Sequence, residues 1–246
     1  MTGIINYLAN PGRFSRVSQK IYPWSLGATV LFLLLGLWFA LYNSPPDYQQ
    51  GETVRIMYIH VPAAWMSLFI YSTMVLLSIF SLVWRHPLAD LLCKSSAPIG
   101  ASFTLIALVT GSIWGKPMWG TWWVWDARLT SVFILFLIYM GHIGLVRSIE
   151  DHTKSAKAAA ILTLIGAINI PIIKFSVDWW NTLHQPASII RVDGPTIHSS
   201  MLVPLVLMAI SFMSFYVSFV LLNTQTELYK RRLKAIFVKS LIEGKK

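Results

Sequence analysis

The stretch IMYIHVPAAWMSLFIYSTMVLLSIFSLVW, residues 56–84, contains 29 residues and no Asp, Glu, Lys or Arg. As an α-helix rising about 1.5 Å per residue, it would extend roughly 43 Å, whereas the hydrocarbon core of a bilayer is only about 30 Å thick. The run therefore predicts a membrane-spanning helix whose first turns, with His60, emerge at one surface. Pro62 agrees with this placement because a helix tolerates proline in its first turn.

Further apolar stretches occur along the chain, and hydrophobic residues make up 55% of its 246 residues while charged residues make up 12%, about half the usual share. Ala158–Ile173 is short and reaches spanning length only if Phe175–Val177 extends it past Lys174, whose stem can snorkel; a re-entrant segment is the alternative. We expect a single all-α integral membrane domain, residues 1–246, with six transmembrane helices at about 24–42, 56–84, 95–115, 129–146, 158–177 and 201–222.

The basic residues predict the orientation of these helices. The net charge of +10 does not indicate nucleic acid, because most basic residues lie in short segments between apolar runs. Fifteen of the 20 would share one side with both termini, which the positive-inside rule places in the cytoplasm. The loops 43–55, 114–128 and 176–200 then face outward. The basic tail, 223–246, is expected to be a cytoplasmic helix lying on anionic lipid or on a partner. The five basic residues on the outer side are Arg55, Lys116, Arg128, Lys174 and Arg191.

Tryptophan is concentrated on the outer side. Seven of the eleven lie in two outer loops: Trp114, Trp119, Trp122, Trp123, Trp125, Trp179 and Trp180. An aromatic belt would place tryptophan at both membrane interfaces, so a belt alone does not explain the asymmetry.

The third loop, WGKPMWGTWWVWDARLT at residues 114–130, is the richest segment. Gly115, Pro117 and Gly120 are expected to interrupt it, so that the chain turns and then lies along the surface. On such a helix Trp119, Trp122 and Trp123 would share one face, with Asp126 continuing the row. Either the indoles only anchor an interfacial helix, or they form a flat platform for a large planar ligand. Their one-sidedness favours the ligand.

Two of the six histidines fit a ligand site on that side. His60 lies where its helix emerges, and His184 follows the second tryptophan cluster in DWWNTLHQP. Two neutral imidazoles at one membrane depth could hold a metal between them. His142 is better explained by helix packing, and His198 is a weaker candidate for the same site. The remaining two, His86 and His152, fall in inner loops.

The choice of metal follows from the ligands that the sequence offers. Zinc requires three or four Cys, His or carboxylate ligands, and Cys93 is the single cysteine. Two histidines among aromatic residues suit a ring-bound iron, as in haem. Arg55 and Arg128 could pair with the haem propionates, although a nearby carboxylate (Glu52 or Asp126) or a lipid phosphate could equally be their partner.

At these residues the chain resembles a known family. WGKPMWGTWWVWDARLT is similar to the tryptophan-rich WWD segment of haem-handling proteins in cytochrome c maturation. With YIHVPAAW around His60 and NIPIIKFSVDWWNTLHQ ending at His184, the chain resembles the haem exporter protein C (CcmC) family over essentially its whole length. The related CcmF and CcsA proteins share the WWD segment but are larger or differently arranged.

The resemblance implies a function. Family members sit in the bacterial inner membrane and deliver haem b at the periplasmic face to the haem chaperone CcmE, together with the transporter subunits CcmA and CcmB and the small protein CcmD. The resemblance also implies a transfer protein rather than an enzyme, although it could assist covalent attachment of haem to the chaperone. The family's axial ligands correspond to His60 and His184, and its periplasmic WWD segment, 114–128, to Trp114, Trp119, Trp122, Trp123, Trp125 and Asp126.

Two other classes stay open. A membrane b-type cytochrome would also use histidine pairs and haem, but would place them between facing helices to carry electrons across the bilayer. A permease subunit without haem would use its tryptophans only as anchors.

Overall fold

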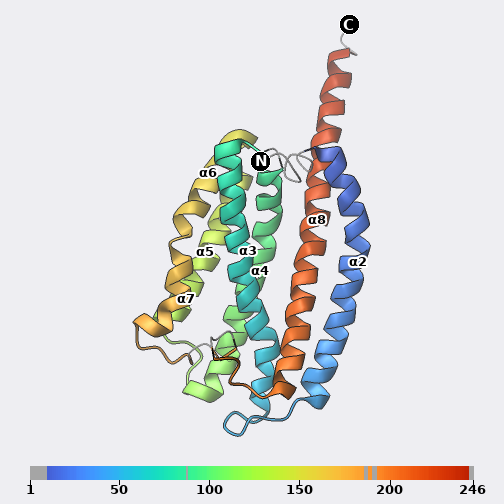
Figure 1. Cartoon of the computed structure of the whole chain (residues 1–246). Helices are drawn as coiled ribbons and strands as arrows, with labels where there is room; N and C mark the ends of the chain where they lie inside the picture. The colour runs from blue at the N-terminus through green and yellow to red at the C-terminus, as the bar shows by residue number, and fades with distance from the viewer. Residues whose placement is uncertain (1–9, 87, 186–187, 190–192, 244–246) are drawn as a thin grey trace.

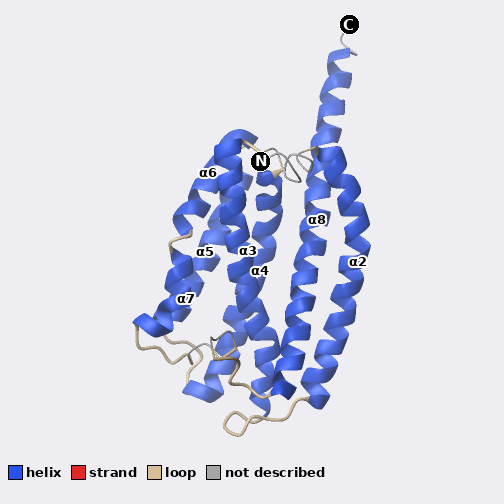
Figure 2. Ribbon diagram, in the orientation of Figure 1, coloured by secondary structure: helices blue, strands red, loops and turns tan. Residues whose placement is uncertain are grey.

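The computed structural model describes residues 10–86, 88–185, 188–189 and 193–243. Arg191, Lys245 and Lys246, which enter the charge count, lie outside them. The described chain is almost entirely helical (Figures 1 and 2). Its elements are α2 (Pro11–Trp38), the π-helix η1 (Phe39–Asn43), the 3-10 helix η2 (Glu52–Ile56), α3 (Met57–Trp84), α4 (Ala89–Trp119), α5 (Ala127–Ser148), α6 (His152–Gly166), α7 (Asn169–Trp179) and α8 (Ser199–Glu243).

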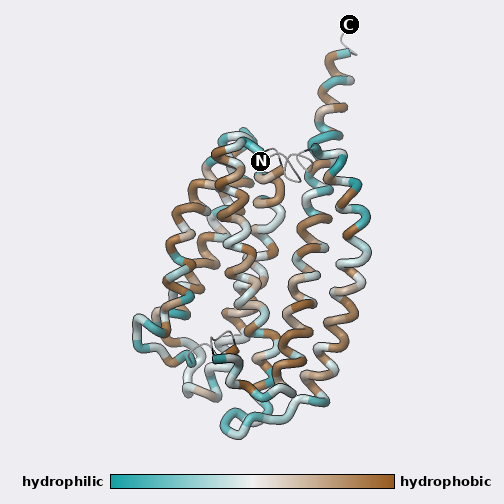
Figure 3. The backbone as a smooth tube through the Cα atoms, in the orientation of Figure 1, coloured by the Kyte–Doolittle hydropathy of each residue, from teal (hydrophilic) through white to brown (hydrophobic). Residues whose placement is uncertain are grey.

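Six helical stretches are long and apolar enough to cross a membrane, which confirms the predicted fold class. Figure 3 shows hydrophobic residues along the middle of the bundle and hydrophilic residues concentrated in its connections. The connections that follow η1, α4 and α7 lie together at one end of the bundle, which we call the loop end (Figure 1). The described chain begins and finishes at the opposite end, which we call the terminal end.

Several helices are longer than the apolar runs predict. α2 begins at Pro11 because the Asn10 side chain accepts hydrogen bonds from the backbone N–H groups of Gly12 and Arg13, at 2.9 and 3.2 Å, and proline suits the first helical position. α4 continues to Trp119, so the expected interruption at Gly115 and Pro117 is wrong. Pro62 lies in the second turn of α3 rather than the first.

The fifth span consists of two helices. α6 ends at Gly166 and α7 begins at Asn169, although one continuous helix was expected. Pro171 accounts for the break, because proline has no N–H to donate and its ring collides with the carbonyl four residues earlier. The side-chain amide of Asn169 donates to the Ser131 carbonyl of α5 at 2.8 Å, which secures α7 beside that helix.

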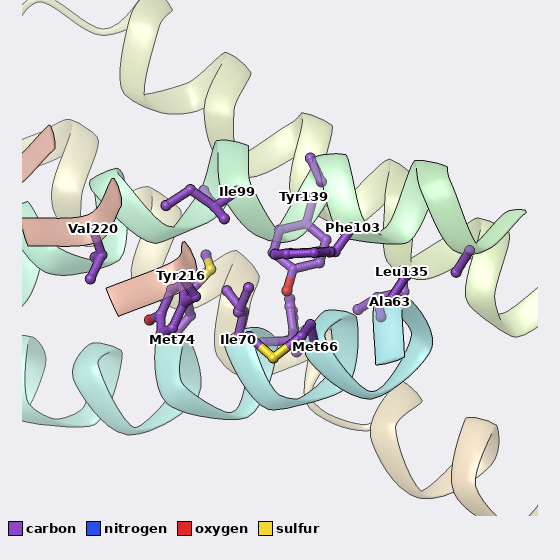
Figure 4. Close-up of a cluster of buried hydrophobic side chains, with 14 of the residues drawn as sticks. Ala63, Met66, Ile70, Met74, Ile99, Phe103, Leu135, Tyr139, Tyr216 and Val220 are labelled. Carbon is purple, nitrogen blue, oxygen red and sulfur yellow. The ribbon is translucent and has the colours of Figure 1, made fainter. Parts of the chain in front are cut away.

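The core lies between α3, α4, α5 and α8 (Figure 4). Tyr139 of α5 packs directly on Gly100 of α4, where an added Cβ would come within 2.3 Å of the tyrosine ring. Its hydroxyl donates to the Ser67 carbonyl of α3 at 2.8 Å. Small residues therefore let the helices approach closely, as is usual inside membranes.

α2 and α8 form a pair at one side of the bundle (Figure 1). Small residues line their contact: Ser218 donates to Ser25 at 2.8 Å, and Ser211 donates to the Thr29 carbonyl at 3.0 Å. Past residue 222, the segment predicted as a separate tail helix continues α8 without a break to Glu243 and projects beyond the terminal end.

Candidate functional site

His60 lies in the first turn of α3 at the loop end and packs against α4. Its ring fits over Gly111, where an added Cβ would come within 2.8 Å of the His60 Cε1 atom. Its Nδ1 atom is 3.1 Å from the Thr110 hydroxyl oxygen. Glycine and threonine on α4 thus make room for the imidazole and fix its orientation.

The protonation of the His60 ring follows from the bonds of Thr110. The Thr110 hydroxyl donates its one proton to the Ile106 carbonyl at 2.6 Å, so its oxygen accepts from His60. His60 therefore carries its proton on Nδ1, and Nε2 keeps a lone pair. The Ala107 carbonyl of α4 is a further hydrogen-bond partner of the ring.

His184 has the same arrangement with a carboxylate in place of the hydroxyl. Its Nδ1 atom is 3.2 Å from Asp126 Oδ2, which can only accept when ionised, so Nδ1 is the donor and Nε2 again has a lone pair. Asp126 is held in turn, because Oδ1 accepts the Leu129 N–H at 2.7 Å and caps α5. Burial lowers the pKa of His184, and the Asp126 carboxylate opposes this shift. The ring is therefore neutral at neutral pH.

The two imidazoles lie at the same end of the bundle although 124 positions separate them in the sequence. Both lie against the loop end of α4, His60 through Thr110 and His184 through Trp119. Each ring is thus oriented through Nδ1 by a partner from another segment, which leaves the two Nε2 atoms for a shared ligand.

Two tryptophans of α4 contact the histidine pair. The Trp114 ring meets His60 edge-on with the ring centroids 5.6 Å apart, and the Trp119 ring meets His184 at 4.9 Å. The Trp114 indole N–H donates to the Gln50 side chain at 2.8 Å. Trp119 folds back over Gly115, where an added Cβ would come within 2.9 Å of its ring.

The tryptophan-rich segment does not continue as a helix, so the shared helical face expected for Trp119, Trp122 and Trp123 does not form. Gly120 ends α4 in the left-handed conformation, with φ of 74°, and its N–H bonds to the Lys116 carbonyl at 3.0 Å. Residues 120–126, which we call the WWD loop, are irregular until Asp126 caps α5. The positive φ requires glycine and explains why the helix stops there.

The remaining tryptophans of this loop lie apart from the histidine pair. Trp123 and Trp125 contact each other, with centroids 5.4 Å apart, and both contact Phe133 of α5. Trp122 is 56% exposed, and the Lys116 ammonium lies 6.0 Å from its ring centroid. The tryptophans therefore form two groups instead of one flat platform.

Both arginines lie at the loop end and have protein partners. Arg55 pairs with Glu52 at 2.5 Å and donates to the Ala40 carbonyl. Arg128 donates through Nε to the Ser176 hydroxyl at 3.0 Å, and through Nη2 to backbone carbonyls of α7. Nη2 of Arg55 and Nη1 of Arg128 make none of these bonds and keep protons for a further acceptor.

The other candidates behave differently. His142 is buried and its Nδ1 atom is 3.0 Å from the Thr163 hydroxyl, in a helix–helix contact of the kind expected. His198 is exposed and bonds to Ser200 at 2.8 Å. Sequence reasoning missed Thr110 and Gly111, which position His60. The sequence feature that could have indicated them is Gly111 itself, a glycine in an apolar helix one turn before Trp114.

Comparison with known proteins agrees with this arrangement. The sequence model of the family described as "Heme exporter protein C" (CcmC) matches residues 4–239. A protein named heme exporter protein C from Bradyrhizobium diazoefficiens is 55% identical over 93% of this chain and 87% of its own length. One with the same name from Haemophilus influenzae is 45% identical over 96% of both chains. A putative cytochrome c biosynthesis ccmC-like mitochondrial protein of Marchantia polymorpha is 54% identical over 85% and 87%.

Proposed function

This chain belongs to the haem exporter protein C family, and from that premise we propose that it binds haem at the loop end, with the iron between His60 and His184. In general terms, it is a multi-pass membrane protein that handles haem in cytochrome c maturation, and a transfer component rather than a classical enzyme. Haem is its cargo.

The observation that carries the proposal is the state of the two imidazoles. Nδ1 of each ring is hydrogen-bonded to an oxygen of another segment, and the tautomer that these partners favour, with the proton on Nδ1, keeps the Nε2 lone pair that axial ligation of a ring-bound iron requires. Among the described residues no three His, Cys, Asp or Glu side chains group as ligands for a free metal ion. The donor set fits an iron that brings four ligands of its own.

The surroundings support a large planar cargo. Trp114 and Trp119 provide aromatic contacts beside the two ligands. We propose that the propionates pair with Arg55 and Arg128, in competition with Glu52 for the first and with Asp126 and Asp178 for the second, because charge-assisted hydrogen bonds are strong. Haem b suits the site because histidine can bind its iron and arginine can pair with its propionates.

Transfer requires that both ligands release the iron. His60 is fixed on a helix, whereas His184 is on the connection between α7 and α8 and is held through Asp126. Release therefore begins at His184, where breaking the Asp126 bond frees the ring to turn. We further propose that the loop end is periplasmic, in the bacterial inner membrane with both termini cytoplasmic, and that haem passes to CcmE in a complex with CcmA, CcmB and CcmD.

Absorption spectroscopy of the purified protein tests the ligands. With haem added, the wild type should show the Soret and visible bands of low-spin, six-coordinate iron. His60→Ala and His184→Ala should each convert these bands to a five-coordinate form, and the double variant should lose stoichiometric haem. His198→Ala is the matched control, since His198 is exposed at the same end, and it should leave the bands unchanged.

Other results would contradict the proposal. A low-spin Soret band that survives the double replacement would overturn the ligand assignment. Failure of the wild type to bind haem, even with the chaperone present, would favour a permease subunit anchored by tryptophan. Reversible reduction of bound haem by a quinol would instead favour an electron carrier.

A further inference from the structure

A second feature of the loop end is an apolar groove between α4 and α5. It has a volume of about 470 Å³, and Val109 and Ile113 of α4 form one wall, Phe133 and Phe136 of α5 the other. Trp123 and Trp125 close it at the WWD loop. Its volume lies within the range of small-molecule sites, roughly 300–1,000 Å³.

The groove lies on a different face of α4 from the histidine pair. His60 packs on Thr110, Gly111 and Trp114, whereas the α4 residues that line the groove are Leu105, Leu108, Val109, Ser112 and Ile113. At about 100° per residue, the mean direction of the second set is roughly opposite to that of the first, and Ile113 lies at the border between them. The groove is therefore separate from the proposed haem site and shares with it only the WWD loop.

Its lining indicates a hydrocarbon chain as the occupant. Val109 and Ile113 are about half exposed on membrane-spanning helices, so lipid is the medium that they meet. A transmembrane helix is about 10–12 Å wide and packs closely against small residues, whereas large side chains dominate this groove. Its polar member, Ser112, already donates to the Trp122 carbonyl at 2.7 Å.

Polar groups beside the groove match the headgroup region of a phospholipid. Lys116 follows Ser112 by one turn, which places it on the same face and nearer the loop end. It is exposed, and its bond to the Gly120 carbonyl at 2.9 Å uses one of three ammonium protons. The Trp123 indole N–H is buried and has no acceptor within the described residues.

We propose that this groove holds one acyl chain of a phospholipid from the leaflet at the loop end, with the phosphate beside Lys116, and that the lipid braces the WWD loop. The loop connects the two sites: Trp125, which closes the groove, is followed directly by Asp126, which holds His184. Lipid in the groove thus stabilises the position of a residue that orients a haem ligand. This second part rests on the proposed function, whereas lipid binding does not.

Photolabelling tests the lipid without reference to haem. The purified chain would be placed in nanodiscs that contain a phospholipid with a diazirine midway along one acyl chain, and labelled peptides would be mapped by mass spectrometry. The label should concentrate on 105–113 and 133–136 and be lost when Val109→Phe and Ile113→Phe together fill the groove. Ile134→Phe with Leu137→Phe is the matched control, because these exposed residues of α5 do not line the groove.

A second arm tests the headgroup. Lys116→Gln should reduce labelling by the phospholipid but not by a diazirine diacylglycerol, which has no phosphate. Equal labelling of the groove and of the control face would mean ordinary annular lipid and overturn the proposal. Loss of groove labelling in the native complex, when it is present in the isolated chain, would assign the groove to a protein partner instead.

The link to the histidine pair has its own readout. In the groove-filling double variant, bound haem should dissociate faster than from the control variant, with both histidines intact. Specific labelling with unchanged haem dissociation would overturn the bracing role and leave the lipid site standing. Absence of haem from the wild type would refute the proposed function alone.

Discussion

His60 and His142 show the same device at opposite ends of the bundle. In each case Nδ1 meets a threonine hydroxyl, Thr110 or Thr163, and that hydroxyl donates to a carbonyl one turn earlier in its own helix. Both rings therefore keep a lone pair on Nε2. The difference is in what surrounds that atom.

At the loop end Trp114 contacts the His60 ring, and a second histidine, His184, contacts Trp119 of the same helix. At His142, Nε2 is buried without a partner in the described residues, next to a cavity of about 30 Å³, enough for about one water. The threonine hydroxyl orients the ring in both places, but within the described residues the loop end adds a second histidine whose Nδ1 also has an acceptor.

The largest effect is expected from Gly111→Leu. A leucine side chain at this position would occupy the place of the His60 ring, since even a Cβ would come within 2.8 Å of it. We expect the low-spin spectrum to be lost as completely as in His60→Ala, although both histidines remain. Gly144→Leu on α5 is the control, because nothing lies within 4 Å of its added Cβ. A low-spin spectrum in Gly111→Leu would show that His60 does not ligate from this position.

Asp126→Ala should have the next largest effect. Loss of the carboxylate leaves His184 without its orienting partner, and partners of this kind are worth about 10–100-fold in metal affinity. Haem affinity, measured by titration in detergent, should fall by that order. Asp126→Asn separates this role from the helix cap, since asparagine also caps helices well. An equal loss in both variants would indicate that the charge matters, and no loss in either would remove Asp126 from the site.

Much of the fold could be predicted from the sequence because length and hydropathy determine whether a helix spans a membrane. The six spans followed directly, and His60 lies near the start of α3. Helix ends were less predictable, because caps such as Asn10 act outside the apolar run. The continuation of α4 through Pro117 also depends on local hydrogen bonding that composition does not reveal.

The site was only partly predictable. Histidine and tryptophan could be recognised by type and by side of the membrane, but their grouping depends on tertiary contacts. That His184 meets Asp126, and that Trp123 turns away to Phe133, follows from a non-helical loop that begins at Gly120. Helical spacing predicted the indoles on one face. Gly120 instead ends the helix in the left-handed conformation, so the indoles that follow it point in other directions.

Thr110→Val should have a smaller effect than Asp126→Ala. Valine keeps the shape of threonine but removes one hydrogen-bond partner of the His60 ring, which keeps the Ala107 carbonyl. A neutral hydroxyl contributes less than a carboxylate, so we expect haem affinity to fall by less than about tenfold. The low-spin spectrum should persist, because helix α3 and Gly111 still position the ring. A loss as large as that of Gly111→Leu would mean that the hydrogen bond, rather than packing, holds His60 in place.

Thr163→Val makes the same change at the other end and should leave haem binding unaffected. The His142 Nδ1 atom would lose the Thr163 hydroxyl and keep only the Ala159 carbonyl, and weakening a buried hydrogen bond costs up to about 1–3 kcal/mol, so the protein should unfold at lower temperature. Adding His142→Phe should recover much of this loss, because replacing both polar partners leaves neither unsatisfied. Thermal unfolding and haem titration of the single and double variants would separate the two outcomes. A weakened haem spectrum in Thr163→Val would show that the two ends of the bundle are coupled, and that His142 is more than a packing residue.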